Sequence, residues 1–196
     1  MIIMKRIAKL VLLLSFLFTT ANAEQGNVRI GVELGLSPVD MEAEDTAQKI
    51  ANASGSTVTT EYSTGVLVGR IFADYGLSQN LYGEIGYFQT SGAEAKYIIG
   101  SDSATESYDA HGFDFSAKFI SDEGLFGKIG MHSTTIDGNA TVTIGSTTYS
   151  ASGEAQGTGM LIGGGVESDG ILYSVTRYND VGGITDFTFF SVGYSF

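Results

Sequence analysis

Apolar and polar residues alternate along most of the chain, in separate stretches. In residues 27–36, every second residue is large and apolar, and the residues between them are Arg29, Gly31, Glu33 and Gly35. Successive side chains of a strand point to opposite faces, so this pattern predicts a strand with one apolar and one polar face. Its ten residues match the length of a tilted membrane-spanning strand, about 9–11 residues.

Seven further stretches alternate in the same way and predict seven more strands. They cover residues 64–75, 81–90, 108–120, 125–136, 156–167, 171–178 and 186–196. The stretch 64–75 is ambiguous, because Val66, Val68 and Phe72 occupy the same alternate positions as Arg70.

The connections between the predicted strands alternate in length. Short turns occupy residues 76–80, 121–124 and 168–170, whereas longer connections occupy 37–63, 91–107 and 137–155, and 179–185 is intermediate. Short turns at one end and long loops at the other are typical of membrane barrels. After residue 23 no apolar run reaches 18 residues, so a helical span is not predicted. We therefore predict an all-β fold for 24–196, an eight-stranded antiparallel up-and-down transmembrane β-barrel.

The first 23 residues have the features of a secretory signal peptide. Lys5, Arg6 and Lys9 precede a short apolar run that ends near Phe18, and Ala21-Asn-Ala23 is a cleavage site of the small-x-small type. Removal of this leader leaves 7 Lys and Arg against 22 Asp and Glu, a formal charge of −15. Such a charge disfavours nucleic acid as a partner, because nucleic-acid binding depends on Lys and Arg at phosphates. The chain has no cysteine, so no disulfide holds the fold.

Charged residues alternate with the apolar residues, so they are expected inside the barrel. This predicted interior set is Arg29, Glu33, Arg70, Glu84, Asp114, Lys118 and Lys128. Ions in a narrow interior are costly unless they are paired, so we predict a network of salt bridges without a continuous wide pore. The set favours a structural plug over a path for protons or ions.

The C-terminal stretch alternates up to the last residue. Phe190, Val192, Tyr194 and Phe196 share one face, and Ser191, Gly193 and Ser195 share the other. Because Trp is absent, any aromatic girdle at the membrane interfaces must use Tyr and Phe. The tyrosines near predicted strand ends or outer faces are Tyr75, Tyr82, Tyr87, Tyr173, Tyr178 and Tyr194.

These features resemble the small bacterial outer-membrane β-barrel family that includes the OmpA-like and OmpX-like barrels. The resemblance covers essentially all of 24–196 and is carried by residues 81–87, 124–130, 157–166 and 190–196. It implies export to the outer membrane, contact with its lipid and lipopolysaccharide, and insertion by the barrel-assembly machinery. In that machinery's substrates the C-terminal strand is the insertion signal, which here would be Phe190, Val192, Tyr194 and Phe196. The family has no shared catalytic residues, and no periplasmic peptidoglycan-binding domain is expected after the barrel.

Candidate chemistry is sparse. His132 and Ser133 are adjacent on a predicted strand and therefore point to opposite faces, which excludes a dyad. His111, beside Asp109, is expected to be an exposed polar residue, and no metal cluster, cofactor site or catalytic site is predicted.

The favoured function is a non-enzymatic surface protein whose acidic outer loops meet a host or surface ligand. The first long connection, 37–63, is the favoured contact region, and residues 41–53 within it can form a short helix. Three alternatives remain open: a narrow porin-like channel, a lipid A-modifying barrel enzyme, and a soluble periplasmic lipocalin-like binder. The last would turn its charged positions to solvent and its apolar positions inward.

Overall fold

The computed structural model describes residues 26–196, so the predicted leader 1–23 lies outside the described residues. Strands dominate the described chain, together with one helix. The elements are β1 (Val28–Pro38), α2 (Ala43–Ser54), β2 (Thr59–Tyr62), β3 (Gly65–Gly76), β4 (Leu81–Thr90), β5 (Ala93–Ile99), β6 (Asp102–Ile120), β7 (Leu125–Ile144), β8 (Thr147–Ser168), β9 (Ile171–Val181) and β10 (Thr185–Ser195). This helix is too short and too polar to cross a membrane.

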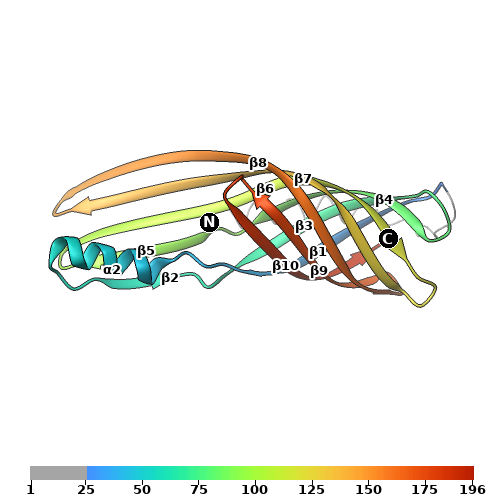
Figure 1. Ribbon diagram of the computed structural model, residues 1–196, viewed down its shortest axis with the longest axis horizontal. Helices are drawn as coiled ribbons and strands as arrows, with labels where there is room; N and C mark the ends of the chain where they lie inside the picture. Colours follow the sequence, from blue (N-terminus) through green and yellow to red (C-terminus); the bar gives the residue numbers. More distant parts are fainter. Residues whose placement is uncertain (1–25) are drawn as a thin grey trace.

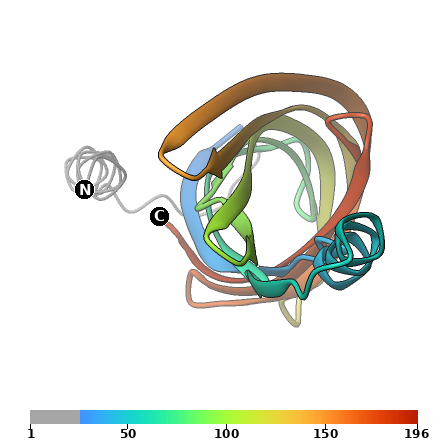
Figure 2. The same ribbon diagram turned by 90° about the vertical axis from the view of Figure 1, so that its left-hand side faces the viewer.

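Eight strands pair into a closed ring in the order β6-β4-β3-β1-β10-β9-β8-β7, and β7 pairs with β6 again. Every pairing is antiparallel. The first and last strands close the ring, from Gly31 opposite Ser195 to Leu36 opposite Phe190. Viewed along its long axis, the ring encloses one interior (Figure 2). The prediction of an eight-stranded antiparallel up-and-down barrel is therefore confirmed.

The three predicted short turns are confirmed at one end of the barrel. They connect β3 to β4, β6 to β7 and β8 to β9, on the right of Figure 1. The last is a two-residue turn in which Asp169 and Gly170 both have positive φ, 51° and 79°. This conformation matches the twist of the two flanking strands, and glycine adopts it without strain.

At the other end the predicted long loops are wrong in part, because most of their residues are strands. The connection predicted over 137–155 is a continuous β7–β8 hairpin that pairs from Leu125–Val166 to Ile144–Thr147. The connection over 91–107 contains β5 and the start of β6, and 37–63 contains α2 and β2. We call the structure beyond the ring the outer platform: α2, β2, β5, and residues 102–110, 137–144 and 147–155 (Figure 1, left).

The helix of the outer platform begins within the region where a short helix was expected. Its buried residues Ala43 and Ala47 pack against Ala95 and Tyr97 of β5. Gly55 ends the helix in the left-handed conformation, with its backbone N–H donating to the Ala51 carbonyl. The platform thus has its own small apolar cluster, which Met41 connects to the apolar residues of the barrel interior.

The outer wall of the ring is apolar, as the alternation predicted. Every ring strand contributes large side chains that are 38–70% exposed. We call these residues the apolar belt: Val28, Leu34, Leu36, Leu67, Tyr75, Leu81, Ile85, Phe113, Phe115, Phe119, Leu125, Ile129, Met131, Met160, Ile162, Val166, Ile171, Tyr173, Val175, Phe190, Val192 and Tyr194.

Candidate functional site

The barrel interior gathers the charged residues from six of the ring strands. All seven charged residues predicted for the interior are at most 8% exposed. Sequence reasoning missed two more, Asp74 and Glu167, although both occupy the same alternate positions as the interior residues of their strands. The nine groups are four cations and five carboxylates: Arg29, Arg70, Lys118 and Lys128, and Glu33, Asp74, Glu84, Asp114 and Glu167.

Arg70 on β3 contacts three carboxylates from three other strands. Its Nε and Nη2 donate to both oxygens of Asp114, at 2.9 and 2.6 Å. Its Nη1 donates to Glu33 at 2.6 Å, and Nη2 also donates to Glu84 at 2.5 Å. Lys128 adds a bond to Glu84 at 3.0 Å. A planar guanidinium suits this role because its five N–H donors fan out in a fixed plane.

A second group of ion pairs lies nearer the short-turn end. Arg29 donates to Asp74 at 2.7 Å and also to Glu167. Lys118 lies 3.3 Å from Asp74 and 3.2 Å from Glu167. A 3.8 Å contact between Lys118 and Glu84 joins this group to the first. The interior charges therefore form one connected network.

Two clusters of apolar side chains pack against the charged network. The cluster toward the outer platform consists of Val66, Val68, Phe88, Ala93, Leu161, Tyr178, Val181, Phe187 and Phe189. A smaller cluster consists of Phe72, Phe126 and Leu172, and its Phe72 ring lies against Arg70 and Lys118 of the network. This explains the ambiguous stretch 64–75, where apolar and charged residues share the inward face. Phe88 and Lys118 are both 0% exposed, so water does not reach these parts of the described interior.

Two of the tyrosines considered for an aromatic girdle point inward instead. Tyr82 is 6% exposed, and its ring lies under the Arg29 guanidinium at 4.6 Å. Tyr178 is 0% exposed, and its hydroxyl donates to Asp114 at 3.1 Å. Neither therefore contributes to a girdle on the outer wall, and both occupy the inward alternate positions of their strands, as Glu84 and Thr176 do.

His132 lies inside the barrel and Ser133 lies outside, as predicted from their adjacency. Nδ1 of His132 is 2.5 Å from the Thr134 hydroxyl, and Nε2 is 2.7 Å from the Asn179 carbonyl oxygen. Both ring nitrogens thus have partners, and the ring also meets the Tyr178 ring edge-on at 5.4 Å. This histidine is a packed interior residue with no nucleophile beside it on an accessible surface.

Three of the residues proposed as the insertion signal lie on the seam strand β10, and the fourth, Phe196, follows its last residue. Phe190, Val192 and Tyr194 are 43–51% exposed on the outer wall. The Tyr194 and Phe196 rings meet at 4.9 Å, and the Phe196 backbone N–H donates to the Ile30 carbonyl on β1. Their role in insertion stays a prediction.

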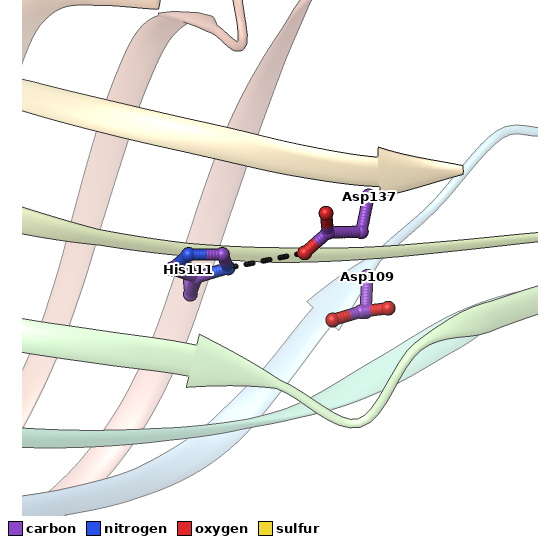
Figure 3. A group of neighbouring side chains, drawn as sticks. All are labelled: Asp109, His111 and Asp137. Atoms are coloured by element: carbon purple, nitrogen blue, oxygen red, sulfur yellow. Dashed lines mark ion pairs between the residues drawn. The ribbon is translucent and has the colours of Figure 1, made fainter. Parts of the chain in front are cut away.

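One cluster with metal-ligating side chains does form in the described chain, although the sequence predicted none. Asp109 and His111 on β6 and Asp137 on β7 bring one ligand atom each within 4.8 Å of one another (Figure 3). Sequence reasoning missed it because Asp137 was placed in a loop rather than opposite Asp109.

Comparisons with known proteins give matches among solved structures. No family model matches the chain, and no curated protein matches its sequence. The chain is similar to Ail, the attachment invasion locus protein of Yersinia pestis, with 9% identity, 88% of this chain and 100% of Ail covered, and a TM-score of 0.48. It is also similar to the outer membrane protein OprG from Pseudomonas aeruginosa, with 9% identity, coverage of 88% and 97%, and a TM-score of 0.46.

A third match is the N-terminal β-barrel domain of Pseudomonas aeruginosa OprF, with 16% identity, coverage of 88% and 100%, and a TM-score of 0.41. Ail has also been solved with the heparin analogue sucrose octasulfate. The fold itself is established by the ring of paired strands.

Proposed function

We propose that the protein is an outer-membrane barrel that anchors the outer platform at the cell surface, where the platform contacts a host or surface ligand. One observation carries this proposal: the wall is inverted relative to a soluble protein. Eight of the nine interior charged residues are 0–8% exposed and the Glu167 side chain is 9% exposed, whereas the large side chains of the apolar belt are 38–70% exposed. In lipid this wall is solvated by acyl chains, and the closed ring leaves no backbone group unpaired along its edges.

The length of the outer platform supports a surface role. β7 has 20 residues, about twice what a tilted strand needs to cross the lipid core. The platform also carries many of the acidic residues outside the interior. Those near α2 and β2 are Asp40, Glu42, Glu44, Asp45 and Glu61. A cationic group on the ligand would suit this acidic rim, because a local excess of one charge attracts the opposite charge.

Side-chain burial in the interior argues against two of the alternative functions, the soluble binder and the channel. A soluble lipocalin-like binder would turn charged positions to solvent, but those positions are buried here. A channel needs a water-filled path, but Phe88 and Lys118 are 0% exposed in the described interior. We expect no defined single-channel steps in planar bilayers, and a clear step would favour the channel instead. The enzyme alternative has no support from His132, which is packed inside.

Limited trypsin digestion of intact cells tests both location and orientation. Lys49 on α2 and Lys96 on β5 are the described lysines of the outer platform, and Arg177 is exposed on the outer wall. The other described basic residues lie in the interior: Arg29, Arg70, Lys118 and Lys128. We expect cleavage at Lys49 in intact cells, with the rest of the barrel protected.

The variant Lys49→Gln is the matched control and should remove that cleavage. The same cells are fractionated, and the protein should be in the outer membrane with heat-modifiable gel mobility. Cleavage only after the outer membrane is permeabilised would indicate the opposite orientation, with the outer platform in the periplasm. Recovery in the soluble periplasm would contradict the membrane proposal altogether.

A further inference from the structure

Three side chains gather on the outer wall at the base of the outer platform. Asp109 and His111 are two residues apart on β6, so they point to the same side. Asp137 lies directly opposite Asp109 in the β6–β7 register. Nδ1 of His111 is 3.5 Å from Oδ2 of Asp137, and Figure 3 shows the imidazole and both carboxylates converging from the two strands.

The electrostatics of this cluster are unfavourable without a cation. Like charges placed directly opposite each other on paired strands are destabilising. Partial burial and the neighbouring Asp137 carboxylate raise the pKa of Asp109 above its usual range. In the described chain neither aspartate is ion-paired with a lysine or arginine; His111 is the cationic partner within reach when it is protonated. The cluster therefore holds up to two negative charges with no permanent positive charge.

The donor set has the chemistry of a transition-metal site. An imidazole nitrogen suits Zn²⁺, Cu²⁺, Fe²⁺ and Ni²⁺, whereas Ca²⁺ and Mg²⁺ prefer oxygen alone. Zn²⁺ binds nitrogen and oxygen at about 2.0–2.2 Å, so neighbouring ligand atoms in a tetrahedral site lie about 3.4 Å apart. The 3.5 Å between His111 Nδ1 and Asp137 Oδ2 already matches this spacing. The three ligand atoms all lie within 4.8 Å of one another, so small side-chain rotations would bring the whole set to it.

The position of the cluster leaves it open to the surrounding medium. His111 comes directly before the belt residue Phe113 on the same outer face of β6, so the cluster lies beyond the belt on the platform side. The His111 and Asp137 side chains are 36% and 43% exposed. Three protein ligands would leave a coordination position for water or another ligand. We propose that Asp109, His111 and Asp137 bind one divalent transition-metal ion, with Zn²⁺ as its representative, across the β6–β7 pair.

Calorimetric titration of the tag-free full-length protein in detergent micelles with Zn²⁺ tests this site. The chain suits the test because it has two histidines and no cysteine. We expect one Zn²⁺ per chain. His111→Asn and Asp137→Asn should each weaken binding by more than about tenfold, because each removes a ligand. Glu123→Gln, which removes an exposed charge at the opposite end, should leave the affinity unchanged.

Heat-modifiable gel mobility shows that each variant is folded, and X-ray absorption of the zinc-loaded protein gives a second measure. The absorption spectrum should show a nitrogen and oxygen shell with one imidazole, and that imidazole signal should be lost in His111→Asn. Absence of binding, or zinc affinity unchanged in His111→Asn, would overturn the site. Equal affinity for Ca²⁺ and Zn²⁺ would also overturn it, because general attraction to surface carboxylates would then explain the binding.

Discussion

The strands β6, β7 and β8 run through both the ring and the outer platform, and the two regions differ in which side chains are exposed. In the ring, Phe113 and Phe115 face outward and are 54% and 56% exposed, while Asp114 between them is 0% exposed. In the outer platform, β5 and α2 pack Tyr97 and Ala47 into an apolar cluster, and Ser- and Thr-rich strands are open to solvent. The pairing of β6 with β7 continues without a break through both regions.

Strand pairing alone therefore does not decide which side chains the outer wall carries. Backbone hydrogen bonds and the two-residue alternation are common to both regions. An apolar outer wall is stable where lipid surrounds it, and a polar wall is stable where water does.

Replacing Arg70 by Met should destabilise the ring most. Arg70 contacts Glu33, Glu84 and Asp114, so its loss leaves buried carboxylates without their main cation. Breaking a buried ion pair by removal of one partner costs about 3–5 kcal/mol. The free energy of unfolding, from urea titration in lipid vesicles, measures this cost.

Arg177→Met is the matched control, because Arg177 pairs with Asp186 on the surface, where both side chains are about half exposed. An exposed pair contributes at most about 1 kcal/mol. Equal losses in the two variants would contradict the claim that the interior network stabilises the barrel.

Replacing an exposed aromatic residue by Lys should have different effects in the two regions. Phe115 in the belt and Tyr149 in the outer platform are similarly exposed, 56% and 61%. A lysine facing the middle of the lipid core costs about 2–4 kcal/mol. In water, Tyr149→Lys should change stability by about 0.5 kcal/mol or less. The same urea titration compares them, and similar costs would show that both residues face the same medium.

A smaller effect is expected from Tyr97→Phe in the outer platform. The Tyr97 hydroxyl donates to Glu106 at 2.6 Å, and burial and this bond raise the pKa of Tyr97 to about 12. Loss of one hydrogen bond should destabilise the platform by about 1 kcal/mol. Hydrogen exchange of platform amides, compared with ring amides, measures this local change, and equal changes in both regions would contradict a platform with its own apolar cluster.

The raised pKa of Tyr97 makes its contribution to stability depend on pH. The folded tyrosine holds its proton more tightly than the unfolded one, so its stabilisation is complete below about pH 10. It is lost as the pH rises through about 12. An ultraviolet titration of tyrosine ionisation should show one group fewer in this high-pH step in Tyr97→Phe, and an unchanged titration would contradict the assignment.

The smallest effect is expected from Asp109→Asn in metal-free protein. Because the pKa of Asp109 is raised, its ionised form disfavours the folded state at neutral pH. The variant should therefore be slightly more stable than the natural protein above the raised pKa. This advantage should disappear as the pH falls below the carboxyl's ordinary range, because both states are then protonated. Thermal unfolding at several pH values measures it, and a destabilised variant at neutral pH would contradict the repulsion.

The sequence predicted which side chains of the ring face inward or outward better than it predicted the contacts among the interior side chains. Alternation alone placed Arg29 and Glu33 inside and Leu34 outside. It would also have placed Asp74 and Glu167 inside, because Asp74 shares the alternate positions of Arg70 and Glu167 shares those of Gly165. It could not show that Arg70 would meet Asp114, because β3 and β6 are not paired with each other but lie on either side of β4.

The outer platform was harder to predict for a different physical reason. Residues 137–155 are rich in Thr, Ser, Ala and Gly, so the hairpin has no continuous apolar face for alternation to reveal. The cluster of Asp109, His111 and Asp137 depends on the register of that unpredicted hairpin. Where the outer wall is polar, the pattern that identifies a strand is weaker although the backbone pairing is the same.

The absence of tryptophan allows a direct test of the inverted wall. Three single-tryptophan variants, Phe115→Trp, Phe88→Trp and Tyr149→Trp, are reconstituted in vesicles whose acyl chains carry bromine, which quenches tryptophan fluorescence on contact. The account predicts strong quenching at position 115 and little at 88, in the interior, or at 149, in the platform. Weak quenching at 115, or equal quenching at all three positions, would contradict a barrel that faces lipid with its apolar belt.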